Sequence, residues 1–126
     1  GFGLLGHLVE MVKASQVDVR LDLAHIPLLA GASDAVAAGI TSSLQPQNLR
    51  LRRAIRNLER AVEHPAYPLL FDPQTDGGLL VGVPAETTAD CIAALRALGY
   101  TRTSVIGEVL PASDALEPIT IRTAAR

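Results

Sequence analysis

The sequence has few of the features that support an aromatic core, a disulfide framework or a membrane span. Only 3% of its 126 residues are aromatic and none is tryptophan, so we expect an aliphatic core. Its single cysteine, Cys91, excludes an internal disulfide and a cysteine-based metal cluster, and it is typical of a reducing compartment. No apolar run approaches the roughly 18–20 residues of a membrane-spanning helix. These absences favour a cytoplasmic protein that makes no contact with a membrane.

The charge balance gives no indication of a nucleic-acid partner, because the formal net charge is only −2. Apolar residues make up 48% of the chain, which predicts a folded protein rather than a disordered one. The length suits one domain that buries roughly 65–70% of the surface of its unfolded chain. The first residue is a glycine inside a glycine-rich motif and no methionine precedes it. We therefore expect residues 1–126 to be one domain of a longer protein.

The most informative stretch is a polar loop, D-P-Q-T-D-G-G, that leads into the apolar run 78–83. Pro73 restricts the backbone, whereas Gly77 and Gly78 can adopt positive φ and let backbone N–H groups approach a ligand. Thr75 adds a hydroxyl group to the same loop. Loops that join regular elements often carry substrate contacts. A tight turn before a buried strand is the simpler interpretation of this stretch.

A second glycine-rich stretch opens the chain. Gly1, Gly3 and Gly6 form the pattern G-x-G-x-x-G at the start of a helix predicted over residues 1–14. Helix N-termini present free N–H groups and the positive end of the helix dipole, so they suit phosphate. His7 could reach a ligand there or be a partly exposed polar residue. The apolar face of this helix carries Leu5, Leu8, Val9 and Val12.

A truncated dinucleotide-binding domain is an alternative interpretation of the first glycine-rich stretch. Residues 17–23 alternate like a strand, and Asp22 lies about where a ribose-binding acid would be expected. That motif is meaningful only when a strand leads into it, and here the sequence begins at the first glycine. We therefore keep this interpretation as a minor alternative.

The rest of the chain predicts an α+β fold in which helices pack on a mixed sheet. Asn48 is placed to cap a helix that runs to Val62 and carries an arginine-rich face. That face is either solvated or meets an acidic partner surface or a phosphate, and it would suit a non-catalytic binding or dimerisation module. The other expected elements are strands at 17–23, 69–71, 78–83, 104–110 and 119–122, and helices near 31–38 and at 86–98.

The helix expected at 86–98 follows an apolar strand and precedes another strand, so residues 78–110 predict a βαβ-like unit. Ile92, Leu95 and Leu98 are expected to face inward from this helix, and Cys91 is interpreted as a small core residue. The three histidines lie far apart in the sequence and show no metal-ligand spacing.

Two stretches resemble a known family. The segment G-F-G-L-L-G-H-L at 1–8 resembles the start of the C-terminal domain of selenide, water dikinase (selenophosphate synthetase). The loop at 72–80 is similar to that family's D-P-Q-T-S-G-G-L-L. The A-A-G-I at 37–40 and the V-I-G-E-V at 105–109 also fit, so the resemblance covers nearly the whole chain. The wider superfamily includes aminoimidazole ribonucleotide synthetase.

The resemblance implies a fold and an activity. It implies a three-layer α/β/α domain, related in part to ferredoxin-like folds, that lies against an N-terminal domain with ATP bound between them. The whole enzyme would be a cytoplasmic homodimer that converts selenide, ATP and water to selenophosphate, AMP and phosphate with Mg²⁺.

The same resemblance limits what this chain can contribute. The family's catalytic cysteine or selenocysteine and its lysine belong to the N-terminal domain, and a metal-binding aspartate precedes the G-F-G segment. No catalytic or metal residue is therefore assigned here. Asp76 replaces the usual serine, and its carboxylate would repel a phosphate unless a cation lay nearby. The residues expected to contact nucleotide or phosphate are Gly1, Gly3, Gly6, His7, Gln74, Thr75, Gly77 and Gly78.

Overall fold

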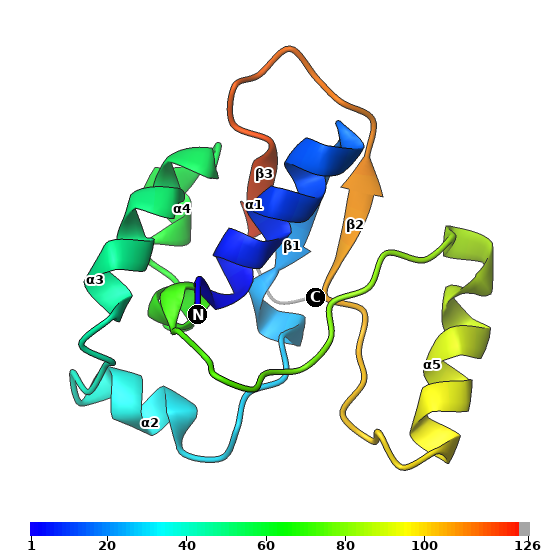
Figure 1. The fold of residues 1–126 in the computed structure, drawn as a ribbon, viewed down its shortest axis with the longest axis horizontal. Helices are drawn as coiled ribbons and strands as arrows, with labels where there is room; N and C mark the ends of the chain where they lie inside the picture. Colours follow the sequence, from blue (N-terminus) through cyan, green and yellow to red (C-terminus); the bar gives the residue numbers. More distant parts are fainter. Residues whose placement is uncertain (124–126) are drawn as a thin grey trace.

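In the computed structural model, residues 1–123 are described, and they form a three-stranded mixed sheet with helices around it (Figure 1). The central strand β1 (Asp18–Asp22) pairs antiparallel with β2 (Gly107–Leu110) and parallel with β3 (Ile119–Arg122). This combination of helices and a mixed sheet confirms the α+β class. The helical segments are α1 (Gly3–Ser15), η1 (Leu23–His25), α2 (Ala32–Ala37), α3 (Gln45–Asn48), η2 (Leu49–Ala54), α4 (Leu58–Ala61), η3 (Tyr67–Phe71), η4 (Ala85–Thr87) and α5 (Thr88–Ala97), where η marks a 3₁₀ helix.

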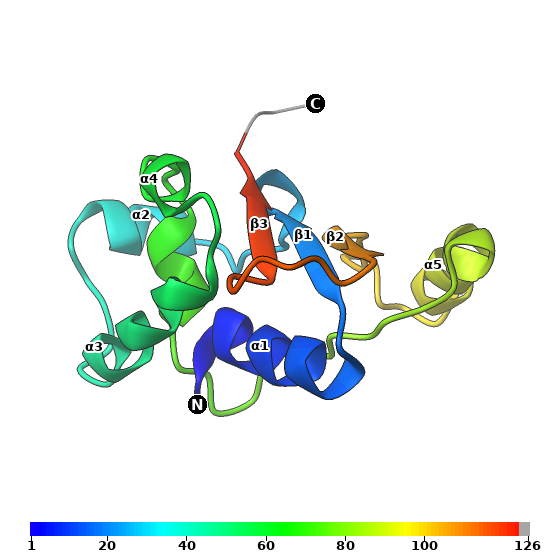
Figure 2. The ribbon, with the colours of Figure 1, turned by 90° about the horizontal axis from the view of Figure 1, so that it is seen from above.

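The apolar core lies between α1, the sheet and η3, and α1 runs along one face of the sheet (Figure 2). The predicted helical face is confirmed, because the side chains at its four apolar positions are buried. Strand β3 buries alternate residues, Ile119 and Ile121, as a strand with one covered face should, whereas the central strand β1 buries four of its five residues. Phe71 of η3 is fully buried, and its ring meets that of Tyr67 edge to face with centroids 5.0 Å apart. The core is therefore aliphatic around one central aromatic ring.

The continuous helix predicted over 48–62 is wrong. The chain instead forms the short helical segments α3, η2 and α4. Ile55 lies between η2 and α4 and has an extended backbone, with φ −91° and ψ 121°. Ile55 is buried and forms a bridge with Ile119, the first residue of β3. The side chain of Asn48 does not cap a helix, contrary to the prediction. A buried β-branched side chain and a sheet contact together outweigh the helical pattern at this point.

Arg56 and Asn57, the two residues after Ile55, cover the outer edge of β3. The Arg56 N–H donates to the Ile119 carbonyl over 2.7 Å. The Asn57 side chain then acts like a neighbouring strand, because its Nδ2 donates to the Ile121 carbonyl and its Oδ1 accepts from the Ile121 N–H. These bonds satisfy backbone groups that an open sheet edge would leave to solvent or to another chain.

The arginines between residues 50 and 60 do not form one continuous face, since the helix that would carry them is interrupted. Arg56 is engaged within the domain, because its guanidinium donates to Asp18, to Ser113 and to the Glu117 carbonyl. Arg52 donates to the carbonyl of Leu49 in its own helical segment. Dimerisation through this surface stays a prediction.

The strands predicted at 69–71 and 78–83 are both wrong. The first is the 3₁₀ helix η3, in which Pro68 occupies an early position that tolerates proline. The second runs without regular structure, and Leu79 is 97% exposed. Three glycines between residues 77 and 82 weaken the strand preference of this run. The βαβ-like unit is therefore absent from residues 78–110, and β2 begins only at Gly107 and pairs antiparallel.

The helix predicted at 86–98 is present as η4 and α5, but it stands apart from the sheet (Figures 1 and 2). With no strand at 78–83 beneath it, none of the residues of α5 is fully buried. Leu98 is 75% exposed rather than inward, whereas Ile92 and Leu95 are half-buried. Cys91 is likewise half-buried, so its interpretation as a core residue is wrong.

A polar cluster ties the start of β1 to the loop before β3. The buried carboxylate of Asp18 accepts hydrogen bonds from the Ser113 hydroxyl over 2.6 Å and from the Arg56 guanidinium over 2.8 Å. These two bonds, in that order, lower the pKa of Asp18 from about 3.8.

Replacing Asp18 with asparagine is expected to flatten the acid dependence of stability. Because the pKa of Asp18 is lowered in the folded state, the contribution of its carboxylate to the free energy of unfolding is complete above the pKa that Asp18 has in the unfolded chain. It is lost as the pH falls through the folded pKa. Urea unfolding from neutral to acid pH should therefore show a shallower loss of stability in Asp18→Asn than in the wild type. Asp114→Asn, an exposed change in the same loop, should keep the wild-type slope, and a wild-type slope for Asp18→Asn would contradict the prediction.

Candidate functional site

The structure brings parts of the two glycine-rich stretches to one pocket of about 450 Å³. Gly1 lies on one side of it, just before α1, and Gln74 and Thr75 lie on another, in the loop after η3. Ser42 and Leu44, on the segment that leads into α3, add a third side that the sequence analysis did not anticipate. The lining residues are Gly1, Ser42, Leu44, Pro73, Gln74 and Thr75.

The chemistry of this pocket suits an anion held by neutral donors. Ser42 and Thr75 carry hydroxyl groups, and Gln74 carries an amide that can donate. The pocket also lies at the start of α1, whose first turn receives no side-chain cap from the described residues. Uncapped N–H groups and the helix dipole favour negative charge at that end of a helix. The arrangement can hold an oxyanion, but its lining has no histidine, lysine or carboxylate side chain that could activate the two hydroxyl groups as nucleophiles.

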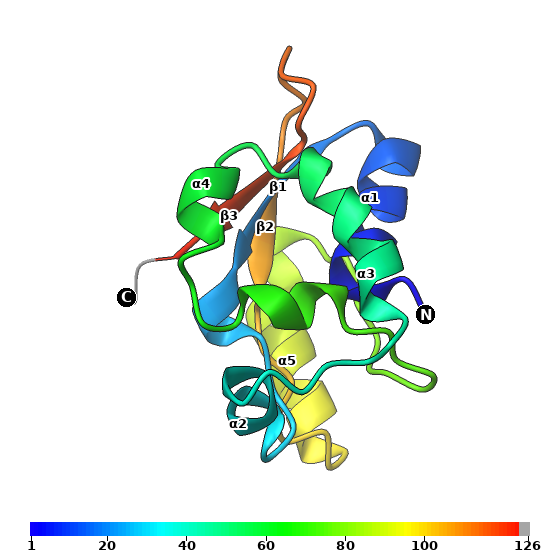
Figure 3. The same ribbon diagram turned by 90° about the vertical axis from the view of Figure 1, so that its left-hand side faces the viewer.

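A short helix holds two sides of this pocket together. Asn48 of α3 is buried, and its Nδ2 lies 3.0 Å from the carbonyl oxygen of Gly1 and 3.0 Å from that of Phe71. Phe71 is the last residue of η3, immediately before the loop at 72–78. Figure 3 shows α3 beside the start of α1. The sequence analysis missed this role of Asn48. An asparagine in a polar stretch predicts a helix cap, and nothing local indicates that it links two distant segments.

Gly3 and Gly6 do not line the pocket; both are buried. Gly3 has φ +78°, and a Cβ there would lie 2.7 Å from the Leu70 carbonyl oxygen. A Cβ at Gly6 would lie 2.6 Å from the Cβ of Phe2. Gly3 therefore lets α1 pack closely on η3, and Gly6 leaves room for Phe2 and for Leu51 of η2. Their assignment as phosphate contacts stays a prediction.

The other predicted contacts lie near the pocket in sequence but are not part of its lining. His7 is exposed on α1, with its ring centroid 5.6 Å from that of Phe2. Gly77 and Gly78 are exposed, and neither adopts positive φ. A Cβ at Gly77 would lie 2.5 Å from Oε1 of Gln74, so this glycine leaves room for a pocket side chain.

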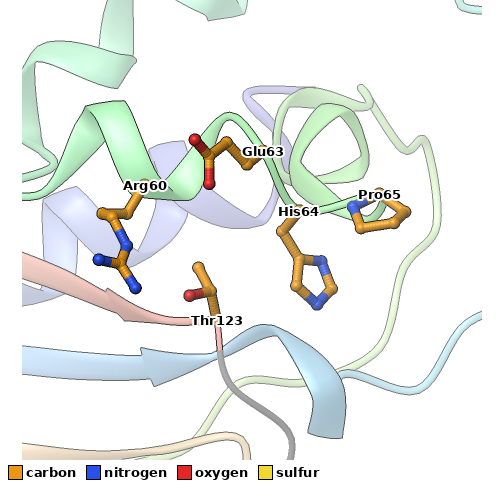
Figure 4. A pocket seen from close by; sticks show the side chains of 5 residues that line it. All are labelled: Arg60, Glu63, His64, Pro65 and Thr123. Atoms are coloured by element: carbon orange, nitrogen blue, oxygen red, sulfur yellow. The ribbon is translucent and has the colours of Figure 1, made fainter.

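A smaller pocket of about 270 Å³ lies between the end of α4 and the end of β3 (Figure 4). Arg60, His64 and Thr123 project toward the same opening, with Glu63 beside them. The Nδ1 of His64 accepts a hydrogen bond from the Ala66 N–H over 3.0 Å, which fixes the orientation of its ring. None of these residues was predicted to bind a ligand.

The described residues contain no group of three or more histidine, cysteine or acidic side chains that could hold a metal ion. Asp76, whose carboxylate would repel a phosphate unless a cation lay nearby, is exposed. Within residues 1–123, no helix is long and apolar enough to cross a membrane.

Comparison with known proteins decides the family. The model of the family described as AIR synthase related protein, C-terminal domain, matches residues 1–116. The chain belongs to this family. The assignment agrees with the resemblance that the two glycine-rich stretches indicated, and it covers nearly all of the sequence.

Several relatives of this AIR synthase related domain are named selenide, water dikinase. The protein from Clostridioides difficile (strain 630) is 34% identical over 118 residues, which cover 90% of this chain and 33% of the relative. The one from Burkholderia orbicola (strain MC0-3) is 39% identical over 110 residues, covering 87% and 31%. The one from Pelobacter propionicus (strain DSM 2379 / NBRC 103807 / OttBd1) is 37% identical over 121 residues, covering 96% and 34%. The chain thus spans about a third of the length of these relatives.

Asp22, the residue on which the dinucleotide-binding alternative depends, is buried in this fold. The carboxylate of Asp22 is buried, accepts from the Ala24 N–H over 3.2 Å and lies 3.1 Å from Nδ1 of His25. A ribose-binding acid must instead be accessible to the ligand. Asp22 stabilises the end of β1 and the start of η1, and the family match leaves this alternative without support.

Proposed function

We propose that this domain is the C-terminal domain of an ATP-dependent selenophosphate synthetase and helps to close its nucleotide and phosphate cleft. The complete enzyme would convert selenide, ATP and water to selenophosphate, AMP and phosphate. The name shared by relatives 34–39% identical supports this reaction. The observation that supports the proposal for the domain itself is that Gly1, Gln74 and Thr75 line one pocket.

Phosphoryl transfer depends mainly on positioning and on neutralising charge, so a domain without a nucleophile can still contribute. In the proposed cleft, Thr75 and Ser42 would donate from their hydroxyl groups, and the start of α1 would add its dipole. Mg²⁺ would neutralise phosphate charge, but the described residues offer no cluster that could hold it. As the resemblance implies, we place the metal ligands and the catalytic groups in an N-terminal domain. The complete protein would act as a cytoplasmic homodimer.

A domain exchange tests the proposal. The corresponding third of the Clostridioides difficile relative is replaced by residues 1–126, and selenide-dependent AMP release is measured. We expect the hybrid to be active. In the hybrid, Thr75→Val should lower kcat/KM roughly tenfold to a hundredfold, the range for a lost hydrogen bond to a charged group.

Thr101→Val is the matched control, because Thr101 is exposed and lies far along the chain from the pocket residues. It should leave kcat/KM unchanged. A folded hybrid without activity would contradict the proposed role of the domain. Equal activity of the Thr75 and Thr101 variants would contradict the proposed contact of Thr75.

The 126-residue chain by itself is expected not to hydrolyse ATP, because the pocket lining has no side chain that could act as a general base, and the described residues contain no metal-holding cluster. The measurement is release of AMP and phosphate by the purified chain with Mg²⁺, with and without selenide. Thr75→Val serves to separate a contaminant from the chain itself. ATP hydrolysis that is present in the wild type and lost in this variant would overturn the prediction.

A further inference from the structure

The helix α3 is linked to neighbouring segments of the chain by two buried amide side chains. Gln45 and Asn48 are its buried polar residues, at 7% and 6% exposure. The Nε2 of Gln45 donates to the Pro68 carbonyl over 3.1 Å, and Nδ2 of Asn48 donates to the carbonyls of Gly1 and Phe71. Both amides therefore hold η3, but only Asn48 also reaches the start of α1.

The bonds of Asn48 require a side chain with two N–H groups on one nitrogen. A primary amide provides this without carrying charge, whereas a hydroxyl group has one hydrogen to donate. Asn48 lies between two carbonyl oxygens from different parts of the chain, and without a shared donor these oxygens would repel each other. A buried acceptor that loses its donor is costly, so the two segments are expected to move apart when the amide is removed.

The two carbonyls belong to the segments that form the pocket. Gly1 lines the pocket itself, and Phe71 directly precedes Asp72 and the lining residues that follow. The third side, which includes Ser42, lies on the segment that leads into α3. The same four-residue helix is therefore linked to all three sides of the pocket, by chain connection on one side and by Asn48 on the other two.

We propose that Asn48 is the positioning residue of this pocket. It sets the separation between the start of α1 and the loop at 72–75, so that both can contact one phosphate group. This role rests on the proposed phosphate-binding function of the pocket. Asn48 acts through the backbone and does not itself touch the ligand.

The test measures binding of inorganic sulfate to the 126-residue chain by NMR, following the backbone N–H signals of Gln74 and Thr75. Sulfate mimics a phosphate group, and its charge stays constant between about pH 5 and 8. Asn48→Ala should weaken binding about tenfold or more, because the segments lose their shared donor. Asn48→Ser keeps one donor and should give an intermediate loss.

A pH profile separates positioning from general loss of stability. In Asn48→Asp the carboxylate would face two carbonyl oxygens, so sulfate binding should be lost at neutral pH. At acid pH the protonated carboxyl can donate one hydrogen, and binding should partly return. The wild type, which has no such group at position 48, supplies the baseline for any other effect of pH.

Two changes on the same helix are matched controls. Gln45→Ala also removes a buried amide bond, so it should lower the urea midpoint, but it should leave sulfate binding within about twofold. Gln47→Ala, at an exposed position, should change neither quantity. Wild-type binding in all three Asn48 variants would overturn the role of Asn48 while leaving the pocket intact. If the wild type itself binds no sulfate, the phosphate pocket and the role of Asn48 both fail.

Discussion

Replacing Phe71 with alanine is expected to lower the free energy of unfolding by about 3–5 kcal/mol, the range for removing a fully buried phenylalanine. Phe71 has no exposed surface and is the largest fully buried side chain among the described residues. Its ring packs in the core cluster and meets Tyr67 edge to face. An aliphatic core with so few aromatic rings has no comparable side chain that could fill the resulting cavity. Urea unfolding followed by far-UV circular dichroism measures the change.

Phe2→Ala is the matched control for this prediction, since it removes the same ring from a position that is 50% exposed. It should cost much less than Phe71→Ala. The Phe71 carbonyl stays in place in the alanine variant, so the bond from Asn48 can persist and the loss reports mainly on the ring. Equal effects of the two substitutions would show that the ring of Phe71 is not central to the core.

Gly3→Ala is expected to be the second strongly destabilising change, by about 2–5 kcal/mol. Part of this comes from the left-handed backbone at φ +78°, which costs roughly 1–2 kcal/mol for a residue with a side chain. The rest comes from overpacking, because the new Cβ would lie 2.7 Å from the Leu70 carbonyl oxygen and 2.9 Å from the carbonyl carbon of Phe71. These are backbone atoms of η3, so α1 and η3 would have to separate. Urea unfolding again provides the measurement.

Two other glycines separate the contributions to this loss. Gly31 has φ +86° but open space where a Cβ would lie, so Gly31→Ala should report the backbone strain alone. Gly82 has neither positive φ nor a close neighbour, so Gly82→Ala should have little effect. We expect the losses to increase in the order Gly82, Gly31, Gly3. A Gly3→Ala variant no less stable than Gly31→Ala would show that close packing at Gly3 contributes nothing.

Local sequence patterns predicted the elements whose structure is determined by their own residues. The apolar face of α1 follows directly from the spacing of Leu5, Leu8, Val9 and Val12, and β3 has the predicted bounds. The strand predicted at 17–23 is present as β1, shortened at each end. The helix predicted near 31–38 is present as α2, and Gly39 follows it with positive φ and its N–H bonded to the Val36 carbonyl. In these cases one face or one residue carries enough information to determine the local structure.

Elements whose structure depends on a distant partner were not predictable in this way. The pattern around Ile55 fits a helix, and only its contact with Ile119 in the structure explains the interruption. The apolar run at 78–83 reads as a strand, but a strand needs a neighbour, and no pairing forms there. For the candidate site, the sequence identified Gly1, Gln74 and Thr75 but gave no indication that residues 42 and 44 join them.

The position of β1 in the middle of the sheet has a consequence for how the domain acquires its structure. Both of its neighbours come from the far end of the chain: Arg20 and its partner Glu108, for example, are 88 residues apart in sequence. Pairing over such separations raises contact order and slows folding, because a long loop must close before any contact is gained. On the ribosome, β1 would stay without strand partners until nearly all of residues 1–122 had been synthesised. This domain is therefore expected to fold late in synthesis, and its exposed first half is a natural substrate for chaperones in the interval.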